Sequence, residues 1–127
     1  MTIEIGACHT DKYIIGSEHT AQSMGNKGVN VLGTPMLVQF AEFASHKLLV
    51  PNLSPQQASV GIRVDIRHLK ATPVGMQVWI KAVLCNIDRS RYVFEVSGRN
   101  EQGAILSGFH ERFIVELESF MARTNAT

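Results

Sequence analysis

The feature that most constrains the fold is a segment, residues 34–50, that is apolar on every side of a predicted helix. It begins TPM, and a hydroxyl residue followed by proline is typical of an N-cap and the first helical position. Thr34 is therefore the expected N-cap, and Pro51 and Pro55 end the helix. The apolar side chains that surround its axis are Met36, Leu37, Val38, Phe40, Ala41, Phe43, Ala44, Leu48 and Leu49. A helix of this kind must be enclosed by the rest of the protein.

After the helix, the pattern changes to that of a strand. Residues 59–68 alternate strictly between polar or small and apolar side chains, and the apolar row runs from Val60 to His68. A period of two predicts a strand with one apolar face. This face should point toward the helix, and the ring of His68 should point the same way.

Three further strand candidates follow, separated by the short turn sequences NIDRS and NEQG. They cover Met76–Ile87, Arg91–Arg99 and Ala104–Val115. Consecutive strands joined by short turns form an antiparallel meander. The segment Ile3–Ile15 should add one or two strands, and ELESFMA near the end predicts a short helix.

One apolar helix and about five or six antiparallel strands can bury each other if the sheet curls around the helix. The expected class is α+β, in a single domain over residues 1–127, because a chain of 127 residues leaves little room for a second core. A curled sheet keeps an open edge, and pairing with the edge of a second copy covers it. A homodimer is therefore expected, and pairing of dimers into a tetramer stays open.

Composition argues against several classes of function. Twelve Lys and Arg against 11 Asp and Glu give a formal charge of +1, without a basic stripe of the kind that follows nucleic acid. No apolar run is long enough for a membrane span or a secretory signal. Cys8 and Cys85 are far apart and the five His show no metal-ligand spacing, so neither a metal nor a cofactor is expected. Two cysteines without a disulfide framework favour a cytoplasmic protein.

Glu42 lies in the middle of the apolar helix, where burial of an unpaired carboxylate is costly. Two structural explanations are an i,i+4 pair with His46 and a narrow wet edge of the helix. The functional explanation is a carboxylate held in a pocket as a general base or nucleophile. Position alone does not choose between them.

Thr34 and His68 also have structural explanations. His68 alone is most simply a core histidine bonded to a backbone carbonyl. Thr34 is either an N-cap or a hydroxyl at a helix start, where the macrodipole favours an anion or a developing oxyanion. Thr34 and Glu42 are eight positions apart, which is about 12 Å along the axis at about 1.5 Å per residue. They can act on one carbonyl only if Glu42 comes from the helix of a second protomer.

Two longer stretches carry a family resemblance. Hotdog-fold thioesterases of the fluoroacetyl-CoA thioesterase type resemble GTPMLVQFAEFASHKLLVPNLSPQQASVGIRVDIRHLKATPVGM and the later GFHERFIVELESF. The likeness covers roughly Gly33 to Phe120, and the motifs ATPxGM and GxHER make it specific. It implies a hotdog fold and hydrolysis of a small or medium acyl-CoA thioester to free acid and CoA. The segment between Gly16 and Thr34 contains no aromatic residue, and the acyl group stays open.

The resemblance also implies which residues form the site. The expected catalytic residues are Thr34, Glu42 and His68. The residues expected to bind substrate are Gly33, Pro35, Gly61 and Arg112. Backbone N–H groups near Thr34 would stabilise the oxyanion while water or the Thr34 hydroxyl attacks. The partner subunit's Glu42 would act as base or nucleophile, and His68 would shuttle a proton or orient Thr34. Coenzyme A enters as part of the substrate.

Three other functions are considered. A noncatalytic module could bind acyl-CoA or a small ligand in the same pocket. A structural dimerisation domain is the second, and it would give the inward-facing polar residues no function. An enoyl-CoA hydratase would place a histidine with an aspartate or asparagine near the helix, which here offers only Glu42 and His46. Arg112 either steadies a polar end of the acyl chain or pairs with Glu111 or Glu116 on its own strand.

Overall fold

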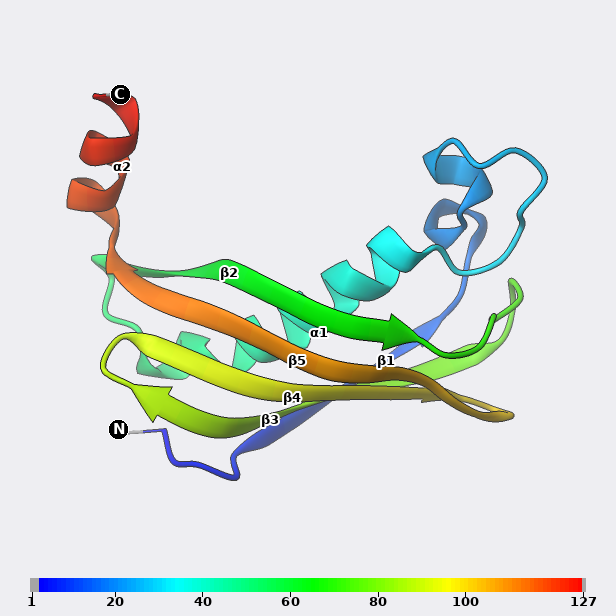
Figure 1. Cartoon of the computed structure of the whole chain (residues 1–127), viewed down its shortest axis with the longest axis horizontal. Helices are drawn as coiled ribbons and strands as arrows, with labels where there is room; N and C mark the ends of the chain where they lie inside the picture. The colour runs from blue at the N-terminus through cyan, green and yellow to red at the C-terminus, as the bar shows by residue number, and fades with distance from the viewer. Residues whose placement is uncertain (1–2, 127) are drawn as a thin grey trace.

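The computed structural model describes residues 3–126 (Figure 1). Within them, the chain forms one five-stranded sheet in the order β1-β3-β4-β5-β2, with every pairing antiparallel. The elements are β1 (Cys8–Ile14), η1 (Ser17–His19), η2 (Gln22–Met24), α1 (Thr34–Leu49), η3 (Val50–Asn52), β2 (Gln57–His68), β3 (Gln77–Asp88), β4 (Arg91–Asn100), β5 (Gly103–Glu116) and α2 (Leu117–Asn125). The sheet curls along α1, which confirms the expected α+β architecture. Among the described residues, no helix combines the length and hydropathy needed to cross a membrane.

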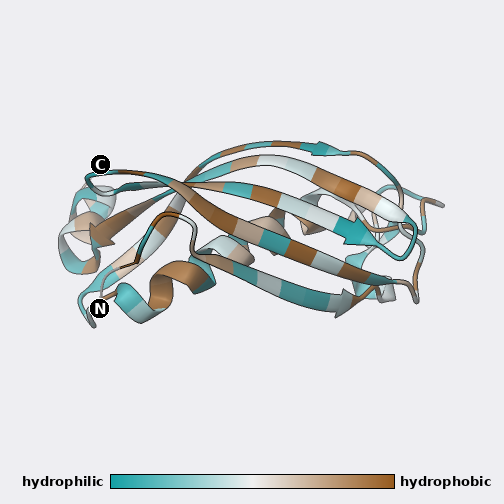
Figure 2. Ribbon diagram, turned by 90° about the horizontal axis from the view of Figure 1, so that it is seen from below, coloured by the Kyte–Doolittle hydropathy of each residue, from teal (hydrophilic) through white to brown (hydrophobic). Residues whose placement is uncertain are grey.

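Most predicted elements are present, with ends shifted by one or two residues. The predicted meander is confirmed by β3, β4 and β5, which pair in sequence. The amino-terminal segment supplies one strand, β1, at the edge beside β3, so the sheet has five strands rather than six. Figure 2 shows hydrophobic and hydrophilic residues alternating along the strands, as a sheet with one buried face requires.

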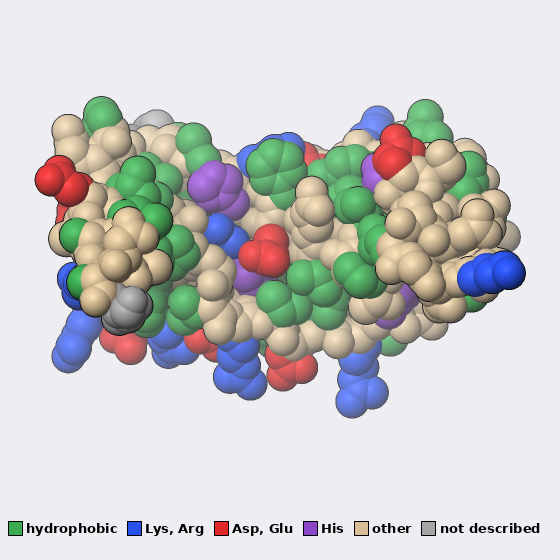
Figure 3. All heavy atoms as spheres, turned by 90° about the horizontal axis from the view of Figure 1, so that it is seen from above, with side chains coloured by type: hydrophobic (Ala, Val, Ile, Leu, Met, Phe, Trp, Pro, Cys, Tyr) green, Lys and Arg blue, Asp and Glu red, His purple; other side chains and the backbone are tan. Residues whose placement is uncertain are grey.

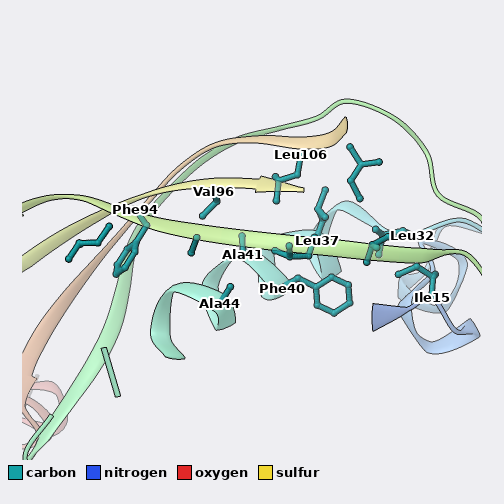
Figure 4. Packing of buried hydrophobic residues seen from close by; sticks show 14 of the residues in the cluster. Ile15, Leu32, Leu37, Phe40, Ala41, Ala44, Phe94, Val96 and Leu106 are labelled. Atoms are coloured by element: carbon teal, nitrogen blue, oxygen red, sulfur yellow. The ribbon is translucent and has the colours of Figure 1, made fainter. Parts of the chain in front are cut away.

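The core lies between α1 and the concave face of the sheet. Its buried side chains are Ile15, Leu32, Leu37, Phe40, Ala41, Ala44, Leu49, Val78, Ile80, Ala82, Leu84, Phe94, Val96, Ile105 and Leu106. Figure 4 shows Leu37 and Ala41 of α1 lying close to the strands. Burying a large aliphatic or aromatic side chain contributes about 1.5–3 kcal/mol, so this layer fixes α1 against the sheet.

The prediction of a fully enclosed helix is wrong for one side of α1 in the single chain. Phe43 is 48% exposed, and Gln39 one turn earlier is also exposed. The sheet covers only one side of α1. An exposed aromatic ring on a mostly apolar helix is therefore available for contact with another surface.

A β-bulge in β2 changes which residues face α1. The pairing with β5 shifts between Gly61 and Arg63, so one extra residue is accommodated there. Val60 lies opposite Phe113, an exposed residue on the outer face, whereas His68 lies opposite buried Leu106. The predicted single apolar row is therefore wrong before the bulge, because the shift moves Val60 to the outer face. Beyond the bulge the row faces inward, as predicted for His68.

Gly108 of β5 allows β2 and β5 to pair closely, and its replacement gives a first prediction. Its φ is +154°, and an added Cβ would lie 2.2 Å from the carbonyl oxygen of Asp65. Because backbone cannot yield as a side chain can, Gly108→Ala should lower the free energy of unfolding by about 2–4 kcal/mol. Urea denaturation measures this loss. Ser107→Ala on the opposite face is the control, and an unchanged midpoint for Gly108→Ala would show that the strands tolerate the contact.

Candidate active site

The start of α1 presents Thr34 to the end of β2. Gly33, with φ −78° and ψ 143°, is the N-cap, and Thr34 is the first helical residue. The prediction of Thr34 as N-cap is therefore wrong, because glycine adopts the extended cap conformation and no side chain caps this end. The Thr34 hydroxyl is consequently available for a contact outside the helix.

That contact is with His68. Thr34 Oγ1 and His68 Nδ1 lie 2.8 Å apart, so a hydrogen bond joins the first residue of α1 to the last residue of β2. His68 therefore bonds a side chain and not the backbone carbonyl considered from the sequence. Its Nε2 is buried, and none of the described residues forms a hydrogen bond with it. If Nδ1 accepts the hydroxyl proton, Nε2 carries the ring proton and lacks an acceptor.

The backbone N–H groups at this helix start are largely occupied. The N–H of Gly33 donates to the carbonyl of His19 at 2.9 Å, and those of Met36 and Leu37 donate to the carbonyl of Gly33 at 3.1 Å. Pro35 has no N–H. Among the described residues, this leaves the N–H of Thr34 at the helix start without a backbone acceptor. Any oxyanion contact at this helix end would therefore come from Thr34 itself.

Glu42 lies in a second cluster, further along α1. Its Oε2 is 3.3 Å from Arg112 Nη1 and 4.0 Å from His110 Nε2. The side chain is 39% exposed and borders a cavity of about 390 Å³, lined by Gln39, Glu42, Phe43, His46, Ser59 and Arg112. Among the described residues, no ion pair or hydrogen bond joins Glu42 to His46, so the i,i+4 pair considered from the sequence does not form. Glu42 is thus a carboxylate with a fixed cationic partner at an open cavity.

Arg112 is anchored from the inner face of β5. Its Nε donates to Ser59 Oγ, and its Nη2 donates to the Ser59 carbonyl at 2.9 Å. The side chain is 9% exposed. The alternative pairing with Glu111 or Glu116 is wrong. Glu111 faces the opposite side of β5 and pairs with Arg91 at 2.9 Å, and Glu116 accepts a hydrogen bond from Gln57 Nε2 at 3.3 Å. Arg112 is therefore turned toward the helix, where it contacts Glu42.

Gly61 makes room for this contact. It lies opposite Arg112 in the β2–β5 pairing. An added Cβ would lie 2.6 Å from Glu42 Oε2 and 3.2 Å from Arg112 Nη1. The absence of a side chain at Gly61 therefore lets the carboxylate and the guanidinium meet against β2.

Three residues of this cluster were not among the site residues predicted from the sequence. Ser59 anchors Arg112, His110 contacts Arg112, and His46 lines the cavity with a buried Nδ1 that has no hydrogen-bond partner among residues 3–126. Burial, together with the charge of Arg112, lowers the pKa of His46, which favours the neutral ring. A signal existed for His110, since it lies in the GxHER motif two residues before Arg112.

The structure brings the seven predicted site residues into two groups. Thr34, His68, Gly33 and Pro35 lie at the start of α1, whereas Glu42, Gly61 and Arg112 meet near its middle. Glu42 follows Thr34 by eight helical positions, a rise of about 12 Å. Within one chain, the carboxylate therefore does not reach the hydroxyl and imidazole.

A sheet curled around one long helix is the hotdog fold. Solved structures with the same architecture include a fluoroacetyl-CoA thioesterase, with TM-score 0.94, 26% identity and coverage of 100% of this chain and 98% of the other. Another is a thioesterase superfamily member from Thermus thermophilus, with TM-score 0.88, 26% identity and coverage of 98% and 93%. The fold and these neighbours place the chain among the hotdog-fold thioesterases.

Sequence comparison narrows this class. The model of the family described as fluoroacetyl-CoA-specific thioesterase matches residues 15–118. A fluoroacetyl-CoA thioesterase from Streptantibioticus cattleyicolor is 33% identical over 93 residues, which cover 73% of this chain and 67% of that protein. The chain therefore belongs to the fluoroacetyl-CoA-specific thioesterase family. It is a thioester hydrolase, as the sequence resemblance implied.

Proposed function

We propose that this protein hydrolyses small or medium acyl-CoA thioesters to free acid and CoA, in a pocket between two protomers. The observation that carries the proposal is the 2.8 Å contact of Thr34 Oγ1 with His68 Nδ1 at a helix start. It pairs a hydroxyl with a base where the helix dipole favours negative charge. The relative from Streptantibioticus cattleyicolor, whose name describes it as a fluoroacetyl-CoA thioesterase, supports a CoA thioester as substrate.

The free edge of β2 supports a dimer that would unite the two groups. β2 pairs only with β5 among the described strands, so its other side is unpaired. Nearby apolar side chains are exposed, including Ile62 at 45% and Val64 at 39%. Figure 3 views this side of the molecule and shows hydrophobic side chains bordering acidic, basic and histidine side chains. Pairing with a second copy would satisfy the edge and cover this surface.

The direction of β2 determines which groups would meet. Thr34 contacts the end of β2 at His68, whereas Glu42 lies beside Gly61 nearer its beginning. In an antiparallel pair of β2 strands related by a two-fold axis near Val64, His68 of one copy lies near the partner subunit's Gly61. The partner subunit's Glu42 would then approach the Thr34–His68 pair. Each dimer would contain two such sites.

The proposed reaction adds water across the C–S bond of the thioester. An oxygen joins the carbonyl carbon, and CoA leaves as the thiol after gaining a proton. The Thr34 N–H would stabilise the oxyanion, and the partner subunit's Glu42 would take a proton from the attacking group or itself attack. His68 would orient Thr34 and carry a proton toward the departing sulfur. We propose no metal or separate cofactor, because CoA is part of the substrate.

The proposed location is the cytoplasm. Cys8 and Cys85 are both exposed and unpaired. Free exposed thiols persist in a reducing compartment, which supports this location.

Thiol release across a panel of acyl-CoAs tests the function. We expect CoA thiol from at least one small or medium substrate, and mass spectrometry should detect the matching free acid. Thr34→Ala should lower kcat/KM by about 100-fold or more, because it removes the hydroxyl that His68 contacts. Saturable binding without thiol release would instead indicate a binding module. A modified acyl group still attached to CoA would indicate a hydratase.

A further inference from the structure

We infer that His110 is a positioning residue: through a lone pair on Nε2 it holds the Arg112 guanidinium in the orientation that meets Glu42. The inference rests on the proposed function in taking Glu42 as a catalytic group. His110 was not among the site residues expected from the sequence. Its side chain is fully buried on the inner face of β5, beside the cavity that Glu42 borders.

The hydrogen bonds of His110 determine its tautomer. Nδ1 lies 2.8 Å from the backbone carbonyl oxygen of Arg63. A carbonyl oxygen only accepts, so Nδ1 must carry the proton. Nε2 lies 3.1 Å from Arg112 Nη1, and arginine only donates. Nε2 must therefore be the unprotonated acceptor, and both ring nitrogens are used in the neutral ring.

The β2 bulge is part of this arrangement. The Arg63 carbonyl that holds Nδ1 lies directly after the register shift between Gly61 and Arg63. The same strand supplies Ser59, which accepts from Arg112 through its hydroxyl and its carbonyl. Two points on β2 therefore fix His110 and Arg112 separately. The guanidinium is held from Ser59 on one side and from His110 on the other.

The charges around His110 keep this acceptor available. The neighbouring ionisable side chains are Arg112 on its own strand, Glu42 on α1, and Glu111 on the opposite face of β5. Burial lowers the pKa of His110, as does the charge of Arg112, whereas Arg63's carbonyl and the two glutamates act in the opposite direction. A proton on Nε2 would face the Arg112 N–H and remove the acceptor. The neutral ring is thus the form that can hold Arg112.

Arg112 Nη1 has two contacts, His110 Nε2 and Glu42 Oε2. If the His110 acceptor is lost, one buried N–H has no partner in the single chain and the guanidinium is no longer held from that side. The Arg112 guanidinium could then move relative to the Glu42 carboxylate. We expect the consequence in the chemical step, because the carboxylate must be placed to within a few tenths of an ångström for proton transfer.

Two substitutions separate the hydrogen bond from packing. His110→Leu removes both ring nitrogens, and we expect kcat to fall about 30-fold with KM within about twofold. His110→Gln keeps one donor for Arg63 and one acceptor for Arg112, and it should recover kcat to within about threefold of the wild type. The packing control is Phe94→Leu, which removes volume opposite His110 on β4 without changing these bonds. It should lower the Tm and leave kcat within about twofold.

A double-mutant cycle tests whether His110 acts through Arg112. In an Arg112→Lys background, which lacks the guanidinium fork, His110→Leu should change kcat by less than about twofold. A loss of about 30-fold in both backgrounds would overturn the inference. Equal losses for His110→Leu and His110→Gln would also overturn it.

Nitrogen NMR of the histidine rings tests the inference without activity. We expect His110 to carry its proton on Nδ1 at pH 7, with Nε2 unprotonated, and this pattern should be preserved in Glu42→Gln. A protonated Nε2 would overturn the proposed role. Absence of thiol release by the wild-type protein would instead refute the proposed function, while the ring spectrum would still decide how His110 is bonded.

Discussion

Replacing Glu42 with glutamine should lower kcat by about 1,000-fold or more and leave the protein folded. The amide keeps the shape of the side chain and an oxygen that can accept from Arg112 Nη1, now 3.3 Å from Oε2. It removes the negative charge, the base and the nucleophile together. Thiol release at saturating acyl-CoA measures kcat, and the Tm measures folding.

The matched control is Glu111→Gln, which lies one position after His110 on the face of β5 away from α1. Glu111 pairs with Arg91 at 2.9 Å and with Arg63 at 3.5 Å, so the same chemical change removes only outer-face ion pairs. It should leave kcat within about twofold. A Glu42→Gln enzyme that retained more than about a tenth of wild-type kcat would show that Glu42 is neither base nor nucleophile.

Mixing two inactive variants should restore activity if the site is shared. We expect Thr34→Ala and Glu42→Gln each to be nearly inactive alone. In a mixed dimer, one site combines both lesions and the other has an intact Thr34 with the partner subunit's intact Glu42. Random exchange of equal amounts gives half mixed dimers, so about a quarter of wild-type activity should appear.

The recovery should depend on subunit exchange. Activity should rise after the two variants are mixed under conditions that dissociate and reassociate dimers, and size-exclusion chromatography with light scattering should confirm the assembly. As a control, Thr34→Ala mixed with His68→Ala should stay inactive, because both lesions affect the same half of the site. Exchange without recovery in the first mixture would contradict a site shared between protomers.

The sequence was sufficient for most of the fold because its patterns are strong. The apolar segment after Thr34 is too long for a strand, and the periods of the later segments distinguish strands from helix. The bulge after Gly61 was not predictable from alternation, since an extra residue leaves the pattern of types unchanged while reversing the faces. The exposure of Phe43 was missed because periodicity does not reveal how much of a helix a sheet covers.

The candidate site was only partly predictable for a different reason. The types and spacing of Thr34, Glu42 and His68 fit a known family, but their contacts depend on segments far apart in sequence. Capping its own helix was one explanation of Thr34, whereas its contact with His68, 34 positions away, was suggested only by the family resemblance. Pairing with near neighbours was one of two explanations of Arg112, yet its partners are Ser59 and Glu42 from other elements. Tertiary geometry decided these pairings.

The shift in β2 lets residues of opposite parity line the same face of the sheet. Ser59 and Gly61 before it are odd-numbered inward positions, while Ile66 and His68 after it are even-numbered ones. Deleting a single residue at the shift would restore uniform parity to the strand. Both halves would then keep their inner lining, whereas the full-length strand paired without the shift would turn one half outward and displace either the arginine anchor or the imidazole. A homologous strand one residue shorter at this point can therefore present both groups on the inner face only if it pairs without the shift.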